Sequence, residues 1–464
     1  MCVIVPVYIV RRTGKLVVKR TLLSCRLQSM HFAGILKLHI ISRRNSGHLP
    51  KSAKLKPSRK SIFRITSREN NNFITRCTNY WTKRLLNAII LGMNNGITEY
   101  FEDVELYEEY DGYFCSVPDI ITIAILGSIC GLRNVHQIHQ WATNDRVSKF
   151  LKEKFGIGHV PCYYWILSLL KYIKPDSLNR CFADWVYSFM PEKSRDMTIS
   201  LDGKTVCSTL KMDKIESPLH IISAQVCELG LTLAQRCTDD KSNEIPAVQE
   251  LLKELNIKGK IVVADALNCQ KDTAKIIVKQ KADYLLCVKD NHPNLKKDIE
   301  DYVQDKTLQS TMLSASKTEK NRGRVEVRTA FVTTDIEWLE QKKEWANLKC
   351  IGTIHTEFTT KKGTSSEWHY YLSSRELTAE QLLHHARMEW AVESMHWLLD
   401  VHFEEDWCRV ESKDVQQSLN MFRKAAINFI RSFKTRNKSK TAISNIMFEC
   451  LMEPQMILRV IFEN

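Results

Sequence analysis

HHARMEWAVESMHWLLDVHFEEDWCR, residues 384–409, places large aromatic and acidic side chains at helical spacing. Four of them are three, four and three positions apart: Trp390, Glu393, Trp397 and Asp400. On a helix, residues at these spacings share one face. The carboxylate of Glu393 then lies between two indoles, where its desolvation is costly unless a positive partner meets it. Two partners are open: a divalent metal ion, or an ion pair with Arg387 or Lys424 at the edge of a helix bundle.

The positive net charge of the chain is concentrated near its N-terminus. The 464 residues carry a formal net charge of +14. Residues 1–92 hold 19 of the 67 basic residues and one acid, Glu69, which gives a net of +18. The remaining 48 basic and 52 acidic residues give a net of −4. Because this larger part is nearly neutral, any nucleic-acid surface on it must be a local patch.

Residues 1–92 also differ in composition from the rest of the chain. They are nearly free of acids and contain a segment rich in Ser, Lys, Arg and Pro, from Gly47 to Arg68. Three interpretations are open: a basic arm that follows a phosphate backbone, a targeting peptide, or an upstream extension of a reading frame that starts at Met93. We favour the third, because the first domain-like pattern comes directly after Met93.

Cysteine usage and hydropathy indicate a reducing, aqueous environment. The 15 cysteines show no CxxC pair and no metal-like spacing, so we expect free thiols that are mostly buried. No run reaches the roughly 18 apolar residues that a membrane-spanning helix requires. The sequence therefore predicts a cytoplasmic location and no membrane partner.

From about Ile97 to Pro191 the hydrophobic pattern is helical. Apolar residues recur at helical spacing, and Gly and Pro separate the segments. We expect helices at 120–129, 135–141, 146–155, 163–173 and 178–190. The sequence thus predicts an all-helical domain over residues 93–195, whose role the periodicity does not reveal.

From Met197 the pattern changes to short strands that alternate with helices. Strands are expected at 197–204, 220–226, 231–235, 260–264 and 283–288. Helices are expected at 244–255 and 270–279. Gly230 separates the second and third strands, as in a hairpin. This succession predicts the fold class: α/β, with a mixed sheet.

Two of these strands end in an aspartate, Asp202 and Asp265. Ligands of open α/β sheets gather at the carboxyl ends of strands. An aspartate there is also a common turn former or helix cap, and Asp202-Gly203 is typical of a turn. Two such aspartates together with Glu393 on a later helix are more than turns require.

Two further regions are basic. We expect the chain to leave the sheet between Asn291 and Thr378 as a β-rich insertion, with Lys317–Arg328 as a basic rim and with strands at 325–332, 348–355 and 368–372. An amphipathic helix is expected over Asp414–Lys434. Residues 411–440 hold eight Lys/Arg and two acids, which is open to two interpretations: a solvated helix face or a contact with a duplex backbone.

Two aspartates and a glutamate from separate elements can hold two Mg²⁺ or Mn²⁺ ions, which prefer carboxylate oxygen. Two such ions activate an attacking hydroxyl and stabilise the leaving oxygen when a phosphodiester is displaced. A zinc hydrolase is not favoured, because the adjacent His384 and His385 should point apart on a helix. No GxxxxGK[ST] or GxGxxG motif in a strand–helix setting supports nucleotide chemistry.

Six sequence segments occur in a distinctive order. They are DGKTV (202–206), VADALNCQ (263–270), DYLLCVKDN (283–291), GRVEVR (323–328), YYLSS (370–374) and R-x-x-W-x-x-E-x-x-H-W-x-L-D-V (387–401). In this order they resemble the H repeat-associated, ISAs-type group of bacterial insertion-sequence transposases. The resemblance covers about residues 97–450.

The resemblance implies an RNase H-like catalytic core at 196–290 and 379–450, interrupted by the β-rich insertion at 291–378. It implies a DDE triad of metal ligands at Asp202, Asp265 and Glu393, with Mg²⁺ or Mn²⁺ as two bound ions. The implied activity is metal-dependent cleavage and strand transfer of double-stranded DNA at the element's ends and at its target. We also expect a homo-oligomer when the protein assembles on DNA, in the bacterial cytoplasm.

Four basic residues are candidate DNA contacts, each weighed against an ordinary surface charge: Lys204, Lys289, Arg324 and Arg387. Trp390 and Trp397 are interpreted as core packing rather than as base-stacking residues. Two functions remain open beside an active transposase. One is a catalytically decayed, DNA-binding descendant of a transposase, and the other is a structure-selective nuclease on the same core.

Overall fold

The computed structural model describes residues 2–10, 16–24, 97–108, 115–188, 190, 196–207, 218–238, 243–321, 324–361, 363–408 and 410–462. The chain divides into two compact units, residues 1–73 and 74–464. In the first unit, β1 (Cys2–Val10) and β2 (Leu16–Ser24) pair as an antiparallel hairpin. The segment from Gly47 to Arg68, on which the interpretations of the N-terminal region depend, lies outside the described residues.

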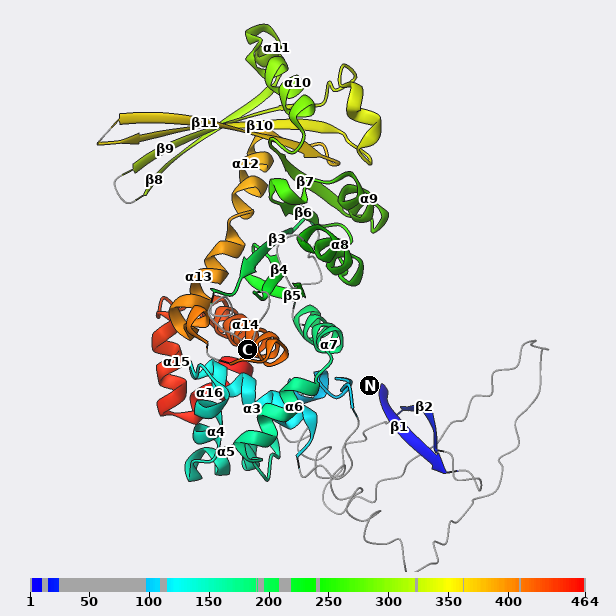
Figure 1. The fold of residues 1–464 in the computed structure, drawn as a ribbon, viewed down its shortest axis with the longest axis vertical. Coiled ribbons are helices and arrows are strands. Elements are labelled where there is room, and N and C mark those ends of the chain that lie inside the picture. The colour runs from blue at the N-terminus through cyan, green and yellow to red at the C-terminus, as the bar shows by residue number, and fades with distance from the viewer. Residues whose placement is uncertain are drawn as a thin grey trace, which may run out of the picture. The chain divides into compact units, whose positions relative to one another are not determined.

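Nine strands of the second unit form one mixed sheet, in the order β5-β4-β3-β6-β7-β11-β10-β9-β8 (Figure 1). The first five along the chain are β3 (Thr198–Thr205), β4 (His220–Val226), β5 (Leu231–Thr238), β6 (Ile261–Ala264) and β7 (Asp283–Val288). β3 pairs antiparallel with β4 and parallel with β6, which pairs parallel with β7. The predicted hairpin is confirmed, with Gly230 at a φ of +64° in the β4–β5 turn.

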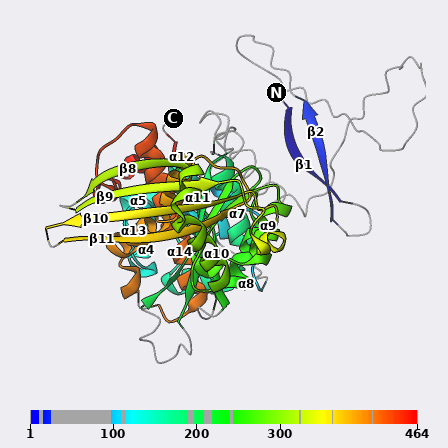
Figure 2. The same ribbon diagram turned by 90° about the horizontal axis from the view of Figure 1, so that it is seen from above.

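The four strands of the expected insertion extend this same sheet. After α10 (Pro293–Gln304) and α11 (Lys306–Thr311) the chain forms β8 (Leu313–Asn321), β9 (Arg324–Thr333), β10 (Cys350–Thr360) and β11 (Gly363–Ser373). β11 pairs with β7, so the expectation that the chain leaves the sheet is wrong. Figure 2 shows the four strands side by side. β8 was not predicted, because it is a largely exposed edge strand without apolar alternation.

Helices cover both faces of the sheet around β3 (Figure 1). α12 (Ala379–Met388) and α13 (Ala391–Phe403) follow one another on one side. α8 (Glu244–Glu254) and α9 (Lys271–Lys279), both predicted, lie on the other side. The stretch 384–409 is therefore two helices, with a break at Glu389 and Trp390 between them.

Side-chain exposure on α13 corrects the interpretation of the two tryptophans. Val392, Met395, Leu399 and Phe403 are buried at helical spacing, and they form the core-facing side of this helix. Trp390 is 43% exposed and Trp397 is 60% exposed. Neither indole is therefore a core residue, and the face that carries Glu393 is open to solvent over much of its length.

Helices also make up the described part of residues 97–188. They are α2 (Ile97–Tyr100), α3 (Val117–Ile129), α4 (Val135–Ala142), α5 (Asp145–Phe155), α6 (Tyr163–Tyr172) and α7 (Pro175–Ser188). The long α14 (Lys413–Arg436), followed by α15 (Ile443–Met452) and α16 (Pro454–Phe462), packs against them and against β5. α14 thus joins the helical part to the sheet, and most of its length is buried.

Burial limits both interpretations of the basic residues in 411–440, because some of them face the protein interior. Arg423 and Lys424 are buried inside the protein. Three further side chains donate hydrogen bonds to backbone carbonyls: Arg431, Lys434 and Arg436. These contacts hold the helix in place, while Arg436, Lys438 and Lys440 near its C-terminal end are exposed, so a solvated face or a duplex contact concerns only this end.

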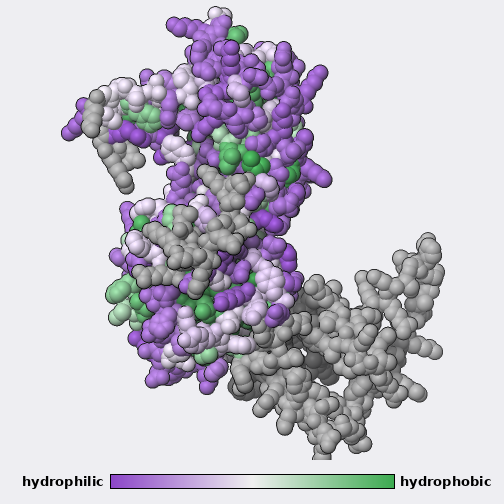
Figure 3. Space-filling model, in the orientation of Figure 1, coloured by the Kyte–Doolittle hydropathy of each residue, from purple (hydrophilic) through white to green (hydrophobic). Residues whose placement is uncertain are grey.

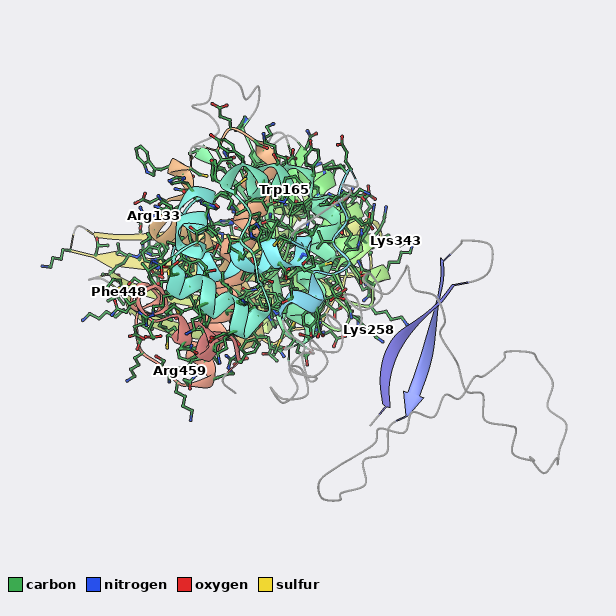
Figure 4. All side chains as sticks on the ribbon, turned by 90° about the horizontal axis from the view of Figure 1, so that it is seen from below. Arg133, Trp165, Lys258, Lys343, Phe448 and Arg459 are labelled. Atoms are coloured by element: carbon green, nitrogen blue, oxygen red, sulfur yellow. The ribbon has the colours of Figure 1, made fainter. Side chains whose placement is uncertain are left out.

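The face of the molecule drawn in Figure 3 is mostly hydrophilic, with small hydrophobic patches. One exposed apolar side chain, Phe448 of α15, lies at the periphery in Figure 4.

The cysteines in the described segments are free and most of them are buried, as expected. Across those segments no helix combines the length and the hydropathy needed to cross a membrane.

Candidate active site

Strand register brings Asp202 and Asp265 to neighbouring positions. β3 and β6 are parallel, and Leu201 is level with Ala264. Asp202 and Asp265 are the next residues of the two chains. Because adjacent strands are about 4.8 Å apart, the backbones of the two aspartates are close neighbours. The turn interpretation of Asp202-Gly203 is wrong, since both residues lie inside β3 and pair with β4.

α12 and α13 contact every second residue of β3. Thr198 Oγ1 is 2.8 Å from Nδ1 of His385, and Ser200 Oγ donates a hydrogen bond of 3.0 Å to the backbone carbonyl at the helix break. Nδ1 of His396 is 3.4 Å from Oδ2 of Asp202. Successive even-numbered positions of β3 thus meet successive turns of the helix pair, because alternate residues of a strand point to one face.

Glu393 belongs to the side of α13 that faces this row. It precedes His396 by three positions and Asp400 by seven, so the three side chains share one face of the helix. His396 contacts Asp202, and Asp400 pairs with Lys204, two residues further along β3. His396 and Asp400 thus contact β3 directly, while the side chain of Glu393 is exposed at the edge of the same helix face.

The charges around Asp202 repel one another. The pKa of Asp202 is raised to about 7. Burial is the largest cause, the negative charges of Asp265, Glu244 and Glu393 add to it, and the Gly203 backbone N–H opposes it. A pKa this far above the ordinary value for aspartate indicates several carboxylates within range of each other, in surroundings that solvate them poorly.

Sequence reasoning missed a further member of this carboxylate group, Glu389. Burial and the charge of Asp265 raise the pKa of Glu389 to about 7, the charge of Lys289 lowers it, and Asp202 and Glu393 raise it further. Glu389 lies four residues before Glu393, a spacing that predicts a shared face in a continuous helix, although in the structure Glu389 lies in the break between α12 and α13. That spacing was the signal in the sequence that could have identified Glu389.

Asp265 is held by a hydrogen-bonded chain that sequence reasoning also missed. The backbone N and Nδ2 of Asn268 both donate to Oδ1 of Asp265, at 3.2 and 3.0 Å. The same Nδ2 donates to Oε1 of Glu244 at 2.9 Å, and Oε2 of Glu244 is 2.9 Å from Nε2 of His220. Asn268, Glu244 and His220 are buried. No described group bonds to Oδ2 of Asp265, so this oxygen is free to take another ligand.

The absence of a side chain at residue 203 makes room for that chain. A Cβ at Gly203 would lie 2.8 Å from Oε2 of Glu244 and still closer to Nε2 of His220. Any larger residue would therefore push this pair away from β3. The glycine after Asp202 serves close packing and not a turn.

The imidazole of His396 lies beside Asp202. The pKa of His396 is lowered to about 3, first by burial and then by the positive charges of Lys424 and Lys204. The imidazole is therefore neutral at ordinary pH. Its Nε2 is buried and finds no hydrogen-bond partner among the described residues. Lys424 does not pair with Glu393 but donates to Ser223 and Gln235, which excludes one of the two ion pairs considered from the sequence.

The four candidate DNA contacts occupy different environments. Lys204 has a 13% exposed side chain and pairs with three carboxylates: Asp400, Glu405 and Asp406. Burial lowers the pKa of Lys204 but these acids raise it, with a net increase. The ammonium group of Lys204 is thus already paired with carboxylates of the protein, and we do not propose that it contacts a phosphate.

Lys289 and Arg387 lie beside the carboxylates. They line a cavity of about 150 Å³ between the insertion strands and α12, together with Glu389, Trp390, Lys317 and Arg328. The guanidinium of Arg387 lies 4.9 Å from the centre of the Trp390 ring, a cation–π contact, and no ion pair joins it to Glu393 in the described part of the chain. These two cations border the carboxylates from the side of the insertion.

Arg324 is far from this group. Val288 at the end of β7 is level with Tyr370, Thr353 and Phe331 of the following strands. Arg324 precedes Phe331 by seven residues, about 23 Å along an extended strand. It pairs with Glu326 and lies over the Phe358 ring, so the structure does not bring it to the carboxylates.

Close clustering of metal-ligand atoms is found at another place. Within the described segments, one group of three or more His, Cys, Asp or Glu has all its ligand atoms within 4.8 Å of each other: Glu228, His384 and His385. The oxygens of Asp202, Asp265 and Glu393 are more widely spaced than this. The expectation that His384 and His385 point apart is wrong, since their ring centres are 5.1 Å apart.

The sequence of the chain matches a family of known proteins. The Transposase DDE domain profile matches residues 220–429, and the DDE_Tnp_1-associated profile matches residues 98–186. YbfL of Escherichia coli (strain K12) is 35% identical over 325 residues, covering 68% of this chain and 85% of that protein. YhhI of the same strain, named as an H repeat-associated candidate transposase, is 33% identical over 328 residues, with the same coverage. The chain belongs to the H repeat-associated DDE transposases.

Among solved structures, this DDE transposase is similar to the piggyBac transposase in a synaptic complex with hairpin DNA. The TM-score is 0.38 at 8% identity, over 79% of this chain and 80% of that chain. A similarity this low supports no residue-level comparison. The profile for the DDE domain spans Asp265 and Glu393 and begins after Asp202.

Proposed function

We propose that this DDE transposase cleaves and joins DNA strands with a catalytic triad formed by Asp202, Asp265 and Glu393. The observation that carries the proposal is a convergence of three acids: two aspartates level on parallel strands, and a glutamate on the helix face that lies along β3. Membership of a transposase family makes DNA the expected substrate.

The residues present suit Mg²⁺ or Mn²⁺. The donor set is all carboxylate, which hard divalent cations prefer. Two bound ions would supply an activated hydroxyl nucleophile and stabilisation of the leaving oxygen in the displacement at phosphorus. Deprotonation of Asp202 and Glu389 in the free protein is costly, first because both carboxyl groups are buried and second because other carboxylates lie near them. A bound cation would offset both effects, which favours the uptake of positive charge at this place.

The protein's own groups position the ligands. Asn268 holds Oδ1 of Asp265 and leaves Oδ2 for the ion. His396, neutral at working pH, holds Asp202 from the α13 side. Lys289 and Arg387 at the edge of the adjoining cavity would bind the phosphates that flank the cleaved bond.

We further infer that β3 to β7 with the following helices are an RNase H-like core at 196–290 and 379–450, with the insertion at 291–378 and a helical domain at 93–195. Three antiparallel strands followed by two parallel ones, with the first aspartate on the central strand, support this assignment. The same proposal expects duplex DNA at element ends and target, a homo-oligomer on that DNA, and action in the bacterial cytoplasm.

The test uses the full chain and duplex oligonucleotides that carry the inverted repeats flanking its own gene. With Mg²⁺ or Mn²⁺ we expect nicking and joining. Asp202→Ala, Asp265→Ala and Glu393→Ala should each lower the rate by at least about a hundredfold, since each removes a metal ligand. Asp272→Asn, an exposed acid paired with Lys275 on α9, is the matched control and should keep the wild-type rate.

Each outcome separates one function from another. Wild-type activity in any of the three alanine variants removes that residue from the triad. Salt-dependent DNA binding without metal-dependent cleavage identifies a catalytically decayed descendant. Hydrolysis without joining identifies a nuclease. Joining that depends on all three carboxylates supports the transposase.

A further inference from the structure

We propose that Glu228, His384 and His385 form a second metal site, of the Zn²⁺ type, separate from the carboxylate pocket. Each of the three side chains offers one ligand atom, and these atoms lie within 4.8 Å of one another. Nε2 of His384 is 3.4 Å from Oε1 of Glu228. The proposal does not depend on the proposed catalytic function.

The donor atoms select the class of metal. Two imidazoles and one carboxylate form a three-ligand set that Zn²⁺ uses, with a fourth position left for water. Imidazole suits Zn²⁺ and its neighbours in the first transition row, whereas Mg²⁺ prefers an all-oxygen set. The two places in this protein therefore differ in the ion that they would take: the triad binds a hard cation, and the Glu-His-His cluster binds zinc.

Thr198, at the start of β3, holds two of the three ligands in position. Its hydroxyl is 2.6 Å from Oε1 of Glu228 and 2.8 Å from Nδ1 of His385. Its backbone N–H donates to the same carboxylate, at 3.0 Å to Oε1 and 2.9 Å to Oε2. Thr198 is buried, and His385 is 5% exposed. Partners of this kind orient the first ligands of metal sites and tune their affinity.

The site would join two elements that are far apart in sequence. Glu228 lies in the turn between β4 and β5, while both histidines are on α12. Thr198 precedes Asp202 by four residues on β3, about 13 Å along an extended strand. A zinc ion there would fix the C-terminal half of α12, just before the break that leads to α13 and Glu393, without touching the proposed catalytic carboxylates.

The experiment titrates Zn²⁺, and Co²⁺ as a spectroscopic probe, into the metal-free full chain by calorimetry and visible absorption. We expect one Zn²⁺ per chain and tetrahedral cobalt bands. His384→Ala and Glu228→Gln should each weaken zinc binding by at least about tenfold, and Thr198→Val by about 10- to 100-fold. His369→Ala is the matched control, because His369 pairs with Glu367 at 3.2 Å without a third ligand.

The site would be overturned by the absence of stoichiometric zinc binding, or by binding that persists unchanged in both His384→Ala and Glu228→Gln. Asp202→Asn and Glu393→Gln keep the site separate from catalysis, since zinc affinity should be unaltered in them. If those two variants lose zinc instead, the ion belongs to the carboxylate pocket and the second site is refuted. The side chain of His384 is 49% exposed, so its replacement leaves the fold intact, which a melting curve without metal verifies.

Discussion

At the scale of residues, folding buries several carboxyl groups close together: Asp202, Asp265, Glu244 and Glu389, the carboxylate pocket. Asp202 and Glu389 both have a pKa of about 7, and for both of them burial is the largest cause. Unpaired carboxylates in such surroundings destabilise a protein unless they hold protons or bind cations. The metal-free protein is therefore expected to be sensitive to pH.

The first prediction concerns this pH dependence. The folded protein keeps the Asp202 proton up to about pH 7, whereas the unfolded chain releases it near pH 4. This stabilisation is fully present below pH 4 and is lost as the pH rises through 7. Without metal, Asp202→Asn should therefore gain in melting temperature relative to wild type between pH 5 and pH 8. A difference that stays constant over this range would contradict the raised pKa.

The same titration is coupled to metal binding. Protons compete with the cation for Asp202, so Mg²⁺ or Mn²⁺ should stabilise the wild type more at pH 8 than at pH 6. Scanning calorimetry with and without metal measures the effect, and Asp202→Asn should show little of it. Equal metal stabilisation in wild type and variant would exclude Asp202 as a ligand.

The second prediction concerns Asn268. In Asn268→Ala the amide that joins Asp265 to Glu244 is lost, and Oδ1 of Asp265 keeps only the hydrogen bond from the backbone N–H of residue 268. We expect the metal concentration for half-maximal cleavage to rise by about 10- to 100-fold. Gln270→Ala removes an amide of the same loop that contacts only a backbone carbonyl, and it should behave as wild type. Unchanged metal dependence in Asn268→Ala would mean that the backbone N–H alone positions Asp265.

The sequence made part of this residue-scale picture predictable. Asp202, Asp265 and Glu393 could be proposed because strand ends and helical spacing are local patterns. The His220–Glu244–Asn268 chain could not, because its members are 24 positions apart at each step and meet only through the tertiary fold. Lys204 was misjudged for the same reason: its carboxylate partners are about 200 residues away.

At the scale of elements, the two sides of α13 differ in solvent exposure. Its buried side packs into the core with Met395 and Phe403, while the opposite side exposes Trp397 beside Glu393. Helical periodicity in the sequence identified the helix correctly but assigned the tryptophans to the wrong side, because large aromatics are usually buried. The alternative that the indoles contact a ligand gains from this exposure.

The third prediction compares the contributions of the buried and the exposed side of α13 to stability. Phe403→Ala should lower the free energy of unfolding by about 3–5 kcal/mol, because it opens a cavity in the core. Trp397→Ala should change it by no more than about 0.5 kcal/mol. Urea unfolding followed by circular dichroism gives both values. A large loss of stability for Trp397→Ala would mean that this indole is packed against protein.

At the scale of the whole molecule, the chain divides after residue 73, within the basic N-terminal residues 1–92. Residues 1–73 are one compact unit, and the sheet with its helices lies in the other. The sequence predicted the strands β3 to β7 and the helices α8, α9 and α14 of the second unit, but it did not predict β8, α10, α11, α15 and α16 or the sheet membership of β9 to β11. Strand pairing between distant segments is set by tertiary contacts, which local alternation does not encode.

The fourth prediction follows from this division. A chain that starts at Met93 should keep the melting temperature and the metal-dependent cleavage of the full chain. It should lose much of the salt-dependent, sequence-independent DNA affinity, because 19 basic residues are removed. Filter binding at several salt concentrations measures the change. An unaltered salt slope would show that residues 1–92 do not touch DNA, and a lost melting transition would make them part of the fold.

The double attachment of α13 to β3 has a thermodynamic consequence for ion uptake. The carbonyl of Glu389 is fixed by Ser200 before Glu393, and Lys204 fixes Asp400 after it. These two contacts anchor the main chain on either side of Glu393. For the metal ion proposed at Glu393 we therefore expect that mainly side-chain torsions would be frozen on binding, an entropic penalty of about 0.5–1.5 kcal/mol. Preorganisation of this kind lets a site with few protein ligands bind a strongly hydrated cation at modest concentrations.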